Sequence, residues 1–138
     1  MNFRQEISIY GLEDDRVQLL EKLYKLATEA SSFEVKFRKA HIAFQCNGKN
    51  NRVNNCVCIN PTRKKLKVSF QLEPKGVYDN IVDNLVKKHH LTPYINRSGQ
   101  IEMGVASGGW YAFHVEKDTS DEAMTELFKT AHLFNFEK

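Results

Sequence analysis

Three cysteines and two histidines are the side chains of this sequence best suited to bind a metal ion: Cys46, Cys56, Cys58, His41 and His114. Structural zinc sites usually leave about two to four residues between paired cysteines, whereas only Val57 separates Cys56 from Cys58. On a regular strand these two thiols would lie on the same face, which suits ordinary half-buried thiols equally well. We therefore predict no metal ion and no other cofactor.

A carboxylate and a lysine alternate at Glu34 and Lys36. In a metal-dependent nuclease the carboxylate would hold a divalent cation, and the lysine would stabilise the attacking water or the phosphate. Such a site needs a second acid, for which Asp14 and Asp15 are candidates. Outward alternation on an amphipathic strand explains the same pair, so a divalent-metal-dependent nuclease is kept as one alternative function.

Basic residues are concentrated in the middle of the chain. The net charge is +3 at pH 7, but residues 1–30 sum to −2, residues 31–100 to +9 and residues 101–138 to −4. A basic surface suits an acidic partner, of which nucleic acid is the commonest, although a solvated face that aids solubility gives the same pattern. The candidate nucleic-acid-binding residues are Lys36, Arg38, Arg52, Arg63, Lys64, Lys65 and Lys67.

Aromatic residues cluster after the glycine pair at residues 108–109. On a strand Tyr111, Phe113 and Val115 share one face, and we expect them in the core. Trp110 lies on the other face and is the candidate for a stacking or partner contact. A protein-interaction or homodimerisation module is therefore the second alternative function.

The elements that must position these residues follow from the apolar periodicity. Spacings of three and four predict helices over residues 13–30, 77–90 and 121–134. Alternation predicts strands over residues 33–46, 52–60, 66–72, 101–105 and 110–116, with the first continuing or restarting near His41. Pro74 and Gly76 interrupt the strand pattern. The expected fold is a single α+β domain over 1–138, an antiparallel sheet of about five strands with three helices, in the order α-β-β-β-α-β-β-α.

Two local features refine this expectation. Leu66, Val68, Phe70 and Leu72 should lie on the core face of their strand, because they alternate with polar residues. Thr119 and Glu122 fit a capping box at the start of the last helix.

Composition narrows the class of protein. The sequence has 41% hydrophobic residues, enough for one core, and no apolar run long enough to cross a bilayer. The polar start does not match a signal peptide, and three cysteines do not form a disulfide framework. We expect a cytoplasmic protein that does not bind membranes.

The chain resembles a bacterial family in three short stretches. These are residues 41–45, residues 59–68, and the Gly108–Gly109–Trp110 turn with the strand and helix that follow it to Phe134. Its members are small uncharacterised domains labelled predicted transport proteins, also found at the C-terminus of GmrSD-type restriction proteins. The resemblance implies an accessory domain near DNA-processing enzymes. The element order is also similar to the double-wing DNA-binding domain of the phage transcription activator MotA, which would imply a link to phage transcription.

The leading prediction is a non-enzymatic nucleic-acid-binding or accessory domain that uses a basic sheet face. Arg63, Lys64, Lys65 and Lys67 form its centre, and DNA is favoured over RNA as the partner. Links to restriction, to DNA processing or to phage transcription come from the two resemblances.

Overall fold

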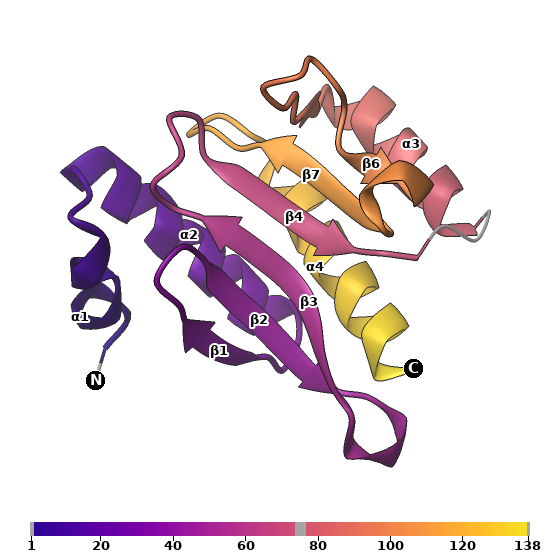
Figure 1. The fold of residues 1–138 in the computed structure, drawn as a ribbon, viewed down its shortest axis with the longest axis horizontal. Coiled ribbons are helices and arrows are strands. Elements are labelled where there is room, and N and C mark those ends of the chain that lie inside the picture. Colours follow the sequence, from indigo (N-terminus) through magenta and orange to yellow (C-terminus); the bar gives the residue numbers. More distant parts are fainter. Residues whose placement is uncertain (1, 74–76, 138) are drawn as a thin grey trace.

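The computed structural model describes residues 2–73 and 77–137. It confirms an α+β fold built on an antiparallel sheet (Figure 1). Over the described residues the sheet has seven strands and the chain forms four α-helices, so the predicted count of about five strands and three helices is too low. The predicted break at Pro74 and Gly76 lies outside the described residues.

The predicted helices form close to their expected bounds, as α2 (Asp14–Ala30), α3 (Val77–His89) and α4 (Asp121–Phe136). A further helix, α1 (Phe3–Ile7), was not predicted because five residues are too short to show an apolar period. Asn2 begins it with a capping box, in which the Asn2 side chain accepts a hydrogen bond from Gln5 N at 2.9 Å.

Five strands form the body of the sheet, in the order β1 (Glu34–Phe37), β2 (Ile42–Asn47), β3 (Val53–Asn60), β4 (Lys67–Gln71) and β7 (Trp110–His114). The two-residue strands β5 (Thr92–Pro93) and β6 (Met103–Gly104) share the outer edge of β7. The strand predicted over residues 33–46 is divided by a turn at residues 38–41. β5 was not predicted, because two residues carry no alternation, and the strand predicted over residues 101–105 shortens to β6.

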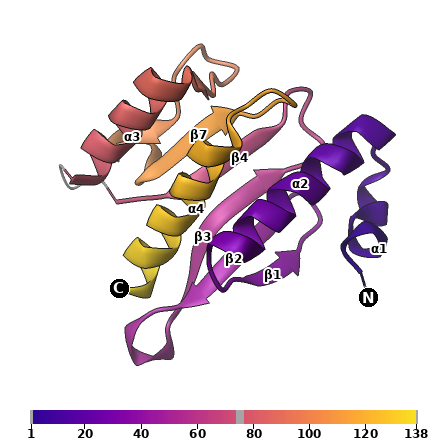
Figure 2. The ribbon, with the colours of Figure 1, turned by 180° about the vertical axis from the view of Figure 1, so that it is seen from behind.

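One face of the sheet carries the core. Helices α2 and α4 lie side by side across it (Figure 2). Phe128 of α4 is fully buried, and its ring centroid lies 5.8 Å from that of Phe44, 5.3 Å from that of Phe70 and 6.2 Å from that of Phe33. The expected core positions on and beside β4 and β7 are confirmed, because all of them are buried: Leu66, Val68, Phe70, Leu72, Tyr111, Phe113 and Val115.

A β-bulge separates the cysteines. Phe44 pairs with Val57 and Gln45 pairs with Asn55, so Cys56 is an extra residue in β3. The bulge turns Cys56 into the core, where its Sγ lies 3.1 Å from Cys46 Sγ. Cys58 lies on the opposite face of the sheet, where it lines a hollow. The prediction that Cys56 and Cys58 share a face is therefore wrong, because a strict two-residue period does not survive an inserted residue.

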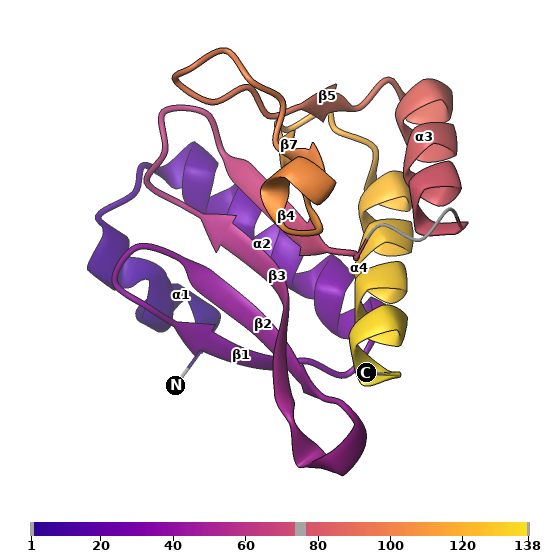
Figure 3. The same ribbon diagram turned by 45° about the vertical axis from the view of Figure 1, so that its right-hand side comes forward.

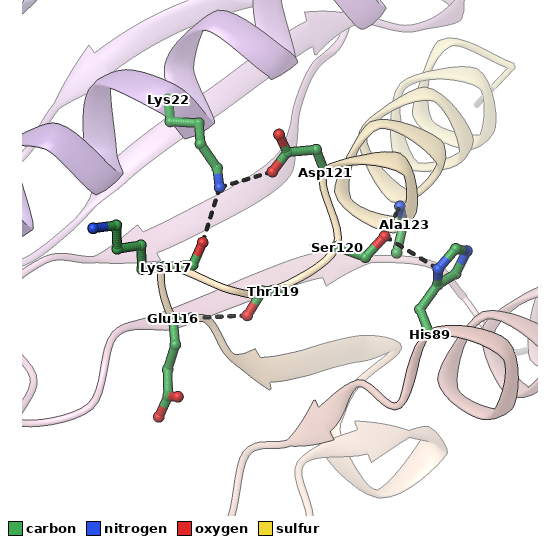
Figure 4. A network of polar contacts seen from close by, with 8 residues as sticks. All are labelled: Lys22, His89, Glu116, Lys117, Thr119, Ser120, Asp121 and Ala123. Carbon is green, nitrogen blue, oxygen red and sulfur yellow. Dashed lines mark hydrogen bonds and ion pairs between the residues drawn. The ribbon is translucent and has the colours of Figure 1, made fainter.

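The loop between β7 and α4 joins three elements (Figure 4). Ser120 caps α4 by accepting a hydrogen bond from Ala123 N at 3.1 Å, and its hydroxyl also lies 3.1 Å from His89 Nδ1 of α3. Thr119 instead accepts from Glu116 N within the turn, so the predicted Thr119–Glu122 capping box is wrong by one residue. Lys22 of α2 donates to the Lys117 carbonyl, which ties the loop to the helix layer.

Candidate functional site

The face of the sheet opposite the helices, called here the open face, has a floor of small side chains. Ala43, Cys58, Ser69 and Ala112 are cross-strand partners in succession, from β2 through β3 and β4 to β7. Small residues in register lower the floor relative to longer side chains on either side. A hollow is therefore built into the strand sequences themselves.

The hollow is a groove of about 660 Å³, called here the open-face groove. The strands contribute Asn60, Lys67 and Ser69 to its lining, and the segment between β5 and β7 contributes Asn96, Gln100 and Ser107. Trp110 lines it at the start of β7. That segment, called here the wall, pairs with β7 through β6 and stands over the open face (Figure 3). The volume is within the range of ligand pockets, about 300–1,000 Å³.

Backbone hydrogen bonds fix this wall to β7. Tyr94 N donates to the Ala112 carbonyl at 2.9 Å, and Ala112 N donates to the Glu102 carbonyl at 2.9 Å. Gly109 N donates to the Gly104 carbonyl at 2.8 Å. Both ends of the wall are thus held in register with one strand, and the groove is preformed.

Lys67 faces the groove but is already paired. Its ammonium lies 2.5 Å from the Glu102 carboxylate and 4.7 Å from the centroid of the Tyr94 ring. Both charged side chains are mostly buried, at 16% and 28% relative exposure. Lys67 therefore holds the wall against the sheet instead of forming the centre of a basic face as predicted.

Burial lowers the pKa of the neighbouring His114 below its ordinary value of 6.5, and the positive charge of Lys65 lowers it further, against the opposing effect of Glu116. Its ring lies 4.7 Å from that of Tyr94, and its Nε2 accepts a 3.5 Å hydrogen bond from Ile95 N. The folded protein therefore favours the neutral imidazole.

We expect stability to fall as the pH drops below about 6.5, because the unfolded chain takes up a proton at His114 before the folded protein does. His114→Gln should lose less stability than the wild type between about pH 6.5 and 5. Urea unfolding midpoints at three pH values measure this difference. His90→Asn, which removes an exposed imidazole, is the control, and equal pH dependence in wild type and His114→Gln would contradict the assignment.

The thiol in the groove is not prepared for nucleophilic chemistry. Burial raises the pKa of Cys58 to about 11, although the nearby Lys67 opposes this. A thiol in this state is almost entirely protonated near neutral pH, and only the thiolate is a strong nucleophile.

Two turns at one end of the sheet bring together five cations, which we call the basic end: Arg38, Lys39, Arg63, Lys64 and Lys65. The turns lie at the left in Figure 1, where the β1–β2 and β3–β4 connections meet. All five side chains are exposed, and none makes an ion pair within 4.0 Å with any described residue.

A set of hydrogen bonds from helix α2, which the sequence analysis did not predict, holds this end of the sheet. The Arg16 guanidinium of α2 donates to the carbonyls of Pro61, Arg63 and Lys64 at 2.8, 2.9 and 3.2 Å. Planar, forked donors suit such a cluster of acceptors. The turn that carries three of the five cations is thereby held in one conformation.

The remaining sequence candidates lie elsewhere. Lys36 forms an ion pair with Glu34 at 2.7 Å on the edge strand β1, and Arg52 lies in the β2–β3 connection at the opposite end of the sheet. The seven predicted residues therefore do not form one continuous basic face. Among the residues that the structure describes, no three His, Cys, Asp or Glu side chains are grouped so that they could hold a metal ion.

The described part of the chain contains no helix of the length and apolarity needed to cross a bilayer.

Comparisons with known proteins bear on the fold. No family model matches the chain, and no curated protein matches it. Among solved structures, the chain is similar to the Deinococcus radiodurans protein DR2400, which carries a DUF419 domain. The TM-score is 0.54 at 15% sequence identity, and the alignment covers 86% of this chain and 78% of that chain. A likeness at this identity shows a shared α+β fold alone.

Proposed function

We propose that this chain is a non-enzymatic nucleic-acid-binding domain, with DNA as the favoured partner, and that phosphates lie on the basic end. The observation that carries the proposal is the convergence of five exposed cations, none of them ion-paired with a described residue, from two turns that are more than twenty residues apart in sequence. Phosphate oxygens are the ligands that arginine and lysine clusters of this kind bind best.

The β3–β4 turn is already held in one conformation, and this supports the same function. The three Arg16 hydrogen bonds hold the β3–β4 turn before any partner arrives, so binding would cost little backbone entropy. The hollow beside this turn on the α2 side is lined by Glu13 and Asp15 as well as by Arg63 and Lys64. These acids repel phosphate from the helix layer, so the partner approaches the basic end from the open face.

The resemblance of residues 41–45, 59–68 and 108–134 to the domains found on restriction proteins points in the same direction. We propose on that basis an accessory role in restriction or DNA processing, in which this domain supplies affinity for DNA and another protein supplies the chemistry. A role in phage transcription is proposed on the similarity of the element order to the double-wing domain of MotA.

The test is a pair of charge-reversal variants with the same change in net charge. Lys64→Glu/Lys65→Glu alters the basic end, and Lys49→Glu/Arg52→Glu alters the opposite end of the sheet. Fluorescence anisotropy with a labelled oligonucleotide should show at least a tenfold weaker Kd for the first variant at low salt and much less change for the second.

Salt provides a second readout. With about four phosphate contacts, the wild-type affinity should fall on the order of a hundredfold between about 50 and 200 mM salt, and the first variant should show a shallower slope. Melting temperatures of both variants check that they fold. No binding by the wild type at low salt, or equal losses in both variants, would overturn the proposal.

A further inference from the structure

Trp110 is the one tryptophan of the chain, and it lines the open-face groove without being fully buried. Its neighbours on β7, Tyr111 and Phe113, are buried in the core beneath the opposite face. Large aromatic rings left on an otherwise polar sheet face are stacking platforms in proteins that bind single-stranded nucleic acid. The groove therefore contains the kind of surface that a base requires.

Amide side chains give the groove hydrogen-bonding groups beside this ring. The Asn96 Oδ1 accepts from Ser98 N at 2.9 Å and from Gln100 N at 3.0 Å, which fixes the position of Asn96. No described residue accepts from the Asn96 or Gln100 side-chain NH₂ groups, and both residues line the groove. Asparagine and glutamine amides pair readily with the edges of bases.

The groove carries no net charge from its Lys67–Glu102 pair, whereas the adjoining basic end is positively charged. Inside the groove the Lys67 and Glu102 charges neutralise each other at 2.5 Å, so a neutral base meets no net charge. At the end of the groove that His41 and Asn60 line, the open face reaches the basic end, because Arg38 N donates to the His41 carbonyl at 2.8 Å. An uncharged pocket beside a cationic end is complementary to a base and its neighbouring phosphates.

The distance along β7 from Trp110 to the basic end sets a minimum length for the ligand. Trp110 and His114 are the two ends of β7, about 14 Å apart at roughly 3.4 Å per residue. A single nucleotide is too short to place its base on Trp110 and its phosphate at the basic end. A stacked and paired duplex base cannot enter beneath the wall at residues 96–107 without first leaving the helix.

We infer that the open-face groove binds an unstacked base of single-stranded DNA against Trp110, while the basic end holds phosphates of the adjoining nucleotides. This inference rests on the proposed function and narrows it from nucleic acid in general to a single strand.

The single tryptophan makes the test specific to the site. The full chain is titrated with a single-stranded oligothymidylate of about ten nucleotides, a duplex of the same length and thymidine monophosphate, while anisotropy and tryptophan emission are recorded together. The single strand should quench Trp110 in step with the anisotropy change. The duplex should bind more weakly and without quenching, and the monophosphate should do neither at the same concentration.

Variants separate stacking from a structural role. Trp110→Ala should weaken single-strand binding about tenfold or more, whereas Trp110→Phe should restore most of the affinity, and duplex binding should change little in both. Phe136→Ala removes an exposed ring on α4 as the matched control and should leave binding unchanged.

The results of these titrations distinguish failure of this inference from failure of the proposed function. Salt-dependent anisotropy changes that are equal for single strand and duplex, without quenching, would overturn this inference and leave the proposed function standing. Quenching by thymidine monophosphate as strong as that by the oligonucleotide would assign the groove to free nucleotides and overturn it as well. Absence of any binding at low salt would overturn both.

Discussion

Replacing Phe128 by alanine is expected to lower the free energy of unfolding by about 3–5 kcal/mol, the range for removing a buried phenylalanine ring. Phe128 is completely buried and contacts Phe33, Phe44 and Phe70, which come from the chain before β1, from β2 and from β4. Loss of the ring opens a cavity where these elements meet, and a large share of a total stability of about 5–15 kcal/mol is removed. Urea unfolding followed by circular dichroism measures the change.

Phe136→Ala is the control, because it makes the same substitution on the same helix at a side chain that is 58% exposed. It should cost less than about 1 kcal/mol. Similar losses in the two variants would show that α4 does not pack on the sheet through Phe128.

Replacing Gly109 by alanine is expected to cost about 2–4 kcal/mol, because backbone strain and a steric clash act together. Gly109 has a φ of +85°, which side chains of L-residues rarely adopt. A Cβ there would lie 2.9 Å from Gln71 Nε2 and 3.1 Å from Glu73 Cα. The Gln71 side chain can move only by losing its 3.0 Å hydrogen bond to the Gly108 carbonyl, and the close contact at Glu73 is with a backbone atom.

Gly108→Ala separates the two causes. Gly108 has a φ of +65°, but nothing lies within 4 Å of the position of its Cβ, so only the strain of about 1 kcal/mol applies. Thermal unfolding of both variants, with the emission of the adjacent Trp110 as a local probe, tests the difference. Equal losses of stability in Gly109→Ala and Gly108→Ala would mean that the close approach of Gly109 to β4 adds nothing to the cost of the substitution.

Elements with a regular apolar spacing could be predicted from the sequence, whereas elements of two to five residues without such a spacing could not. Helix α2 and the core face of β4 follow from apolar spacing that extends over many residues. The strands β5 and β6 have two residues each and exist because the edge of β7 supplies their hydrogen bonds. The position of β5 depends on pairing with residues about twenty positions away, which no local pattern contains. The position of β6 was predicted within residues 101–105, but its length was not.

Some features of the candidate site could likewise be predicted from the sequence, and others could not. The exposure of Arg63, Lys64 and Lys65 and the location of Trp110 on the polar face could be predicted from turn composition and strand alternation. The partner of Lys67 could not, because Glu102 is thirty-five residues away in sequence. Arg16 gave no signal either, since an arginine near the start of a helix usually faces solvent. Cys56 was misplaced because one inserted residue reverses the alternation.

The position of α4 in the chain has a consequence for how the protein is made. This helix follows every strand that it covers, and it supplies Phe128, Leu127 and Met124 to the core. Hairpin pairing from β1 to β4 is local in sequence and can form early, but only α2 is available to cover its apolar face until residues 121–136 leave the ribosome, and the part that α4 covers stays exposed. At about 5–20 residues per second, that part of the nascent sheet is exposed for several seconds, a period in which chaperones that hold apolar surfaces have the most to contribute.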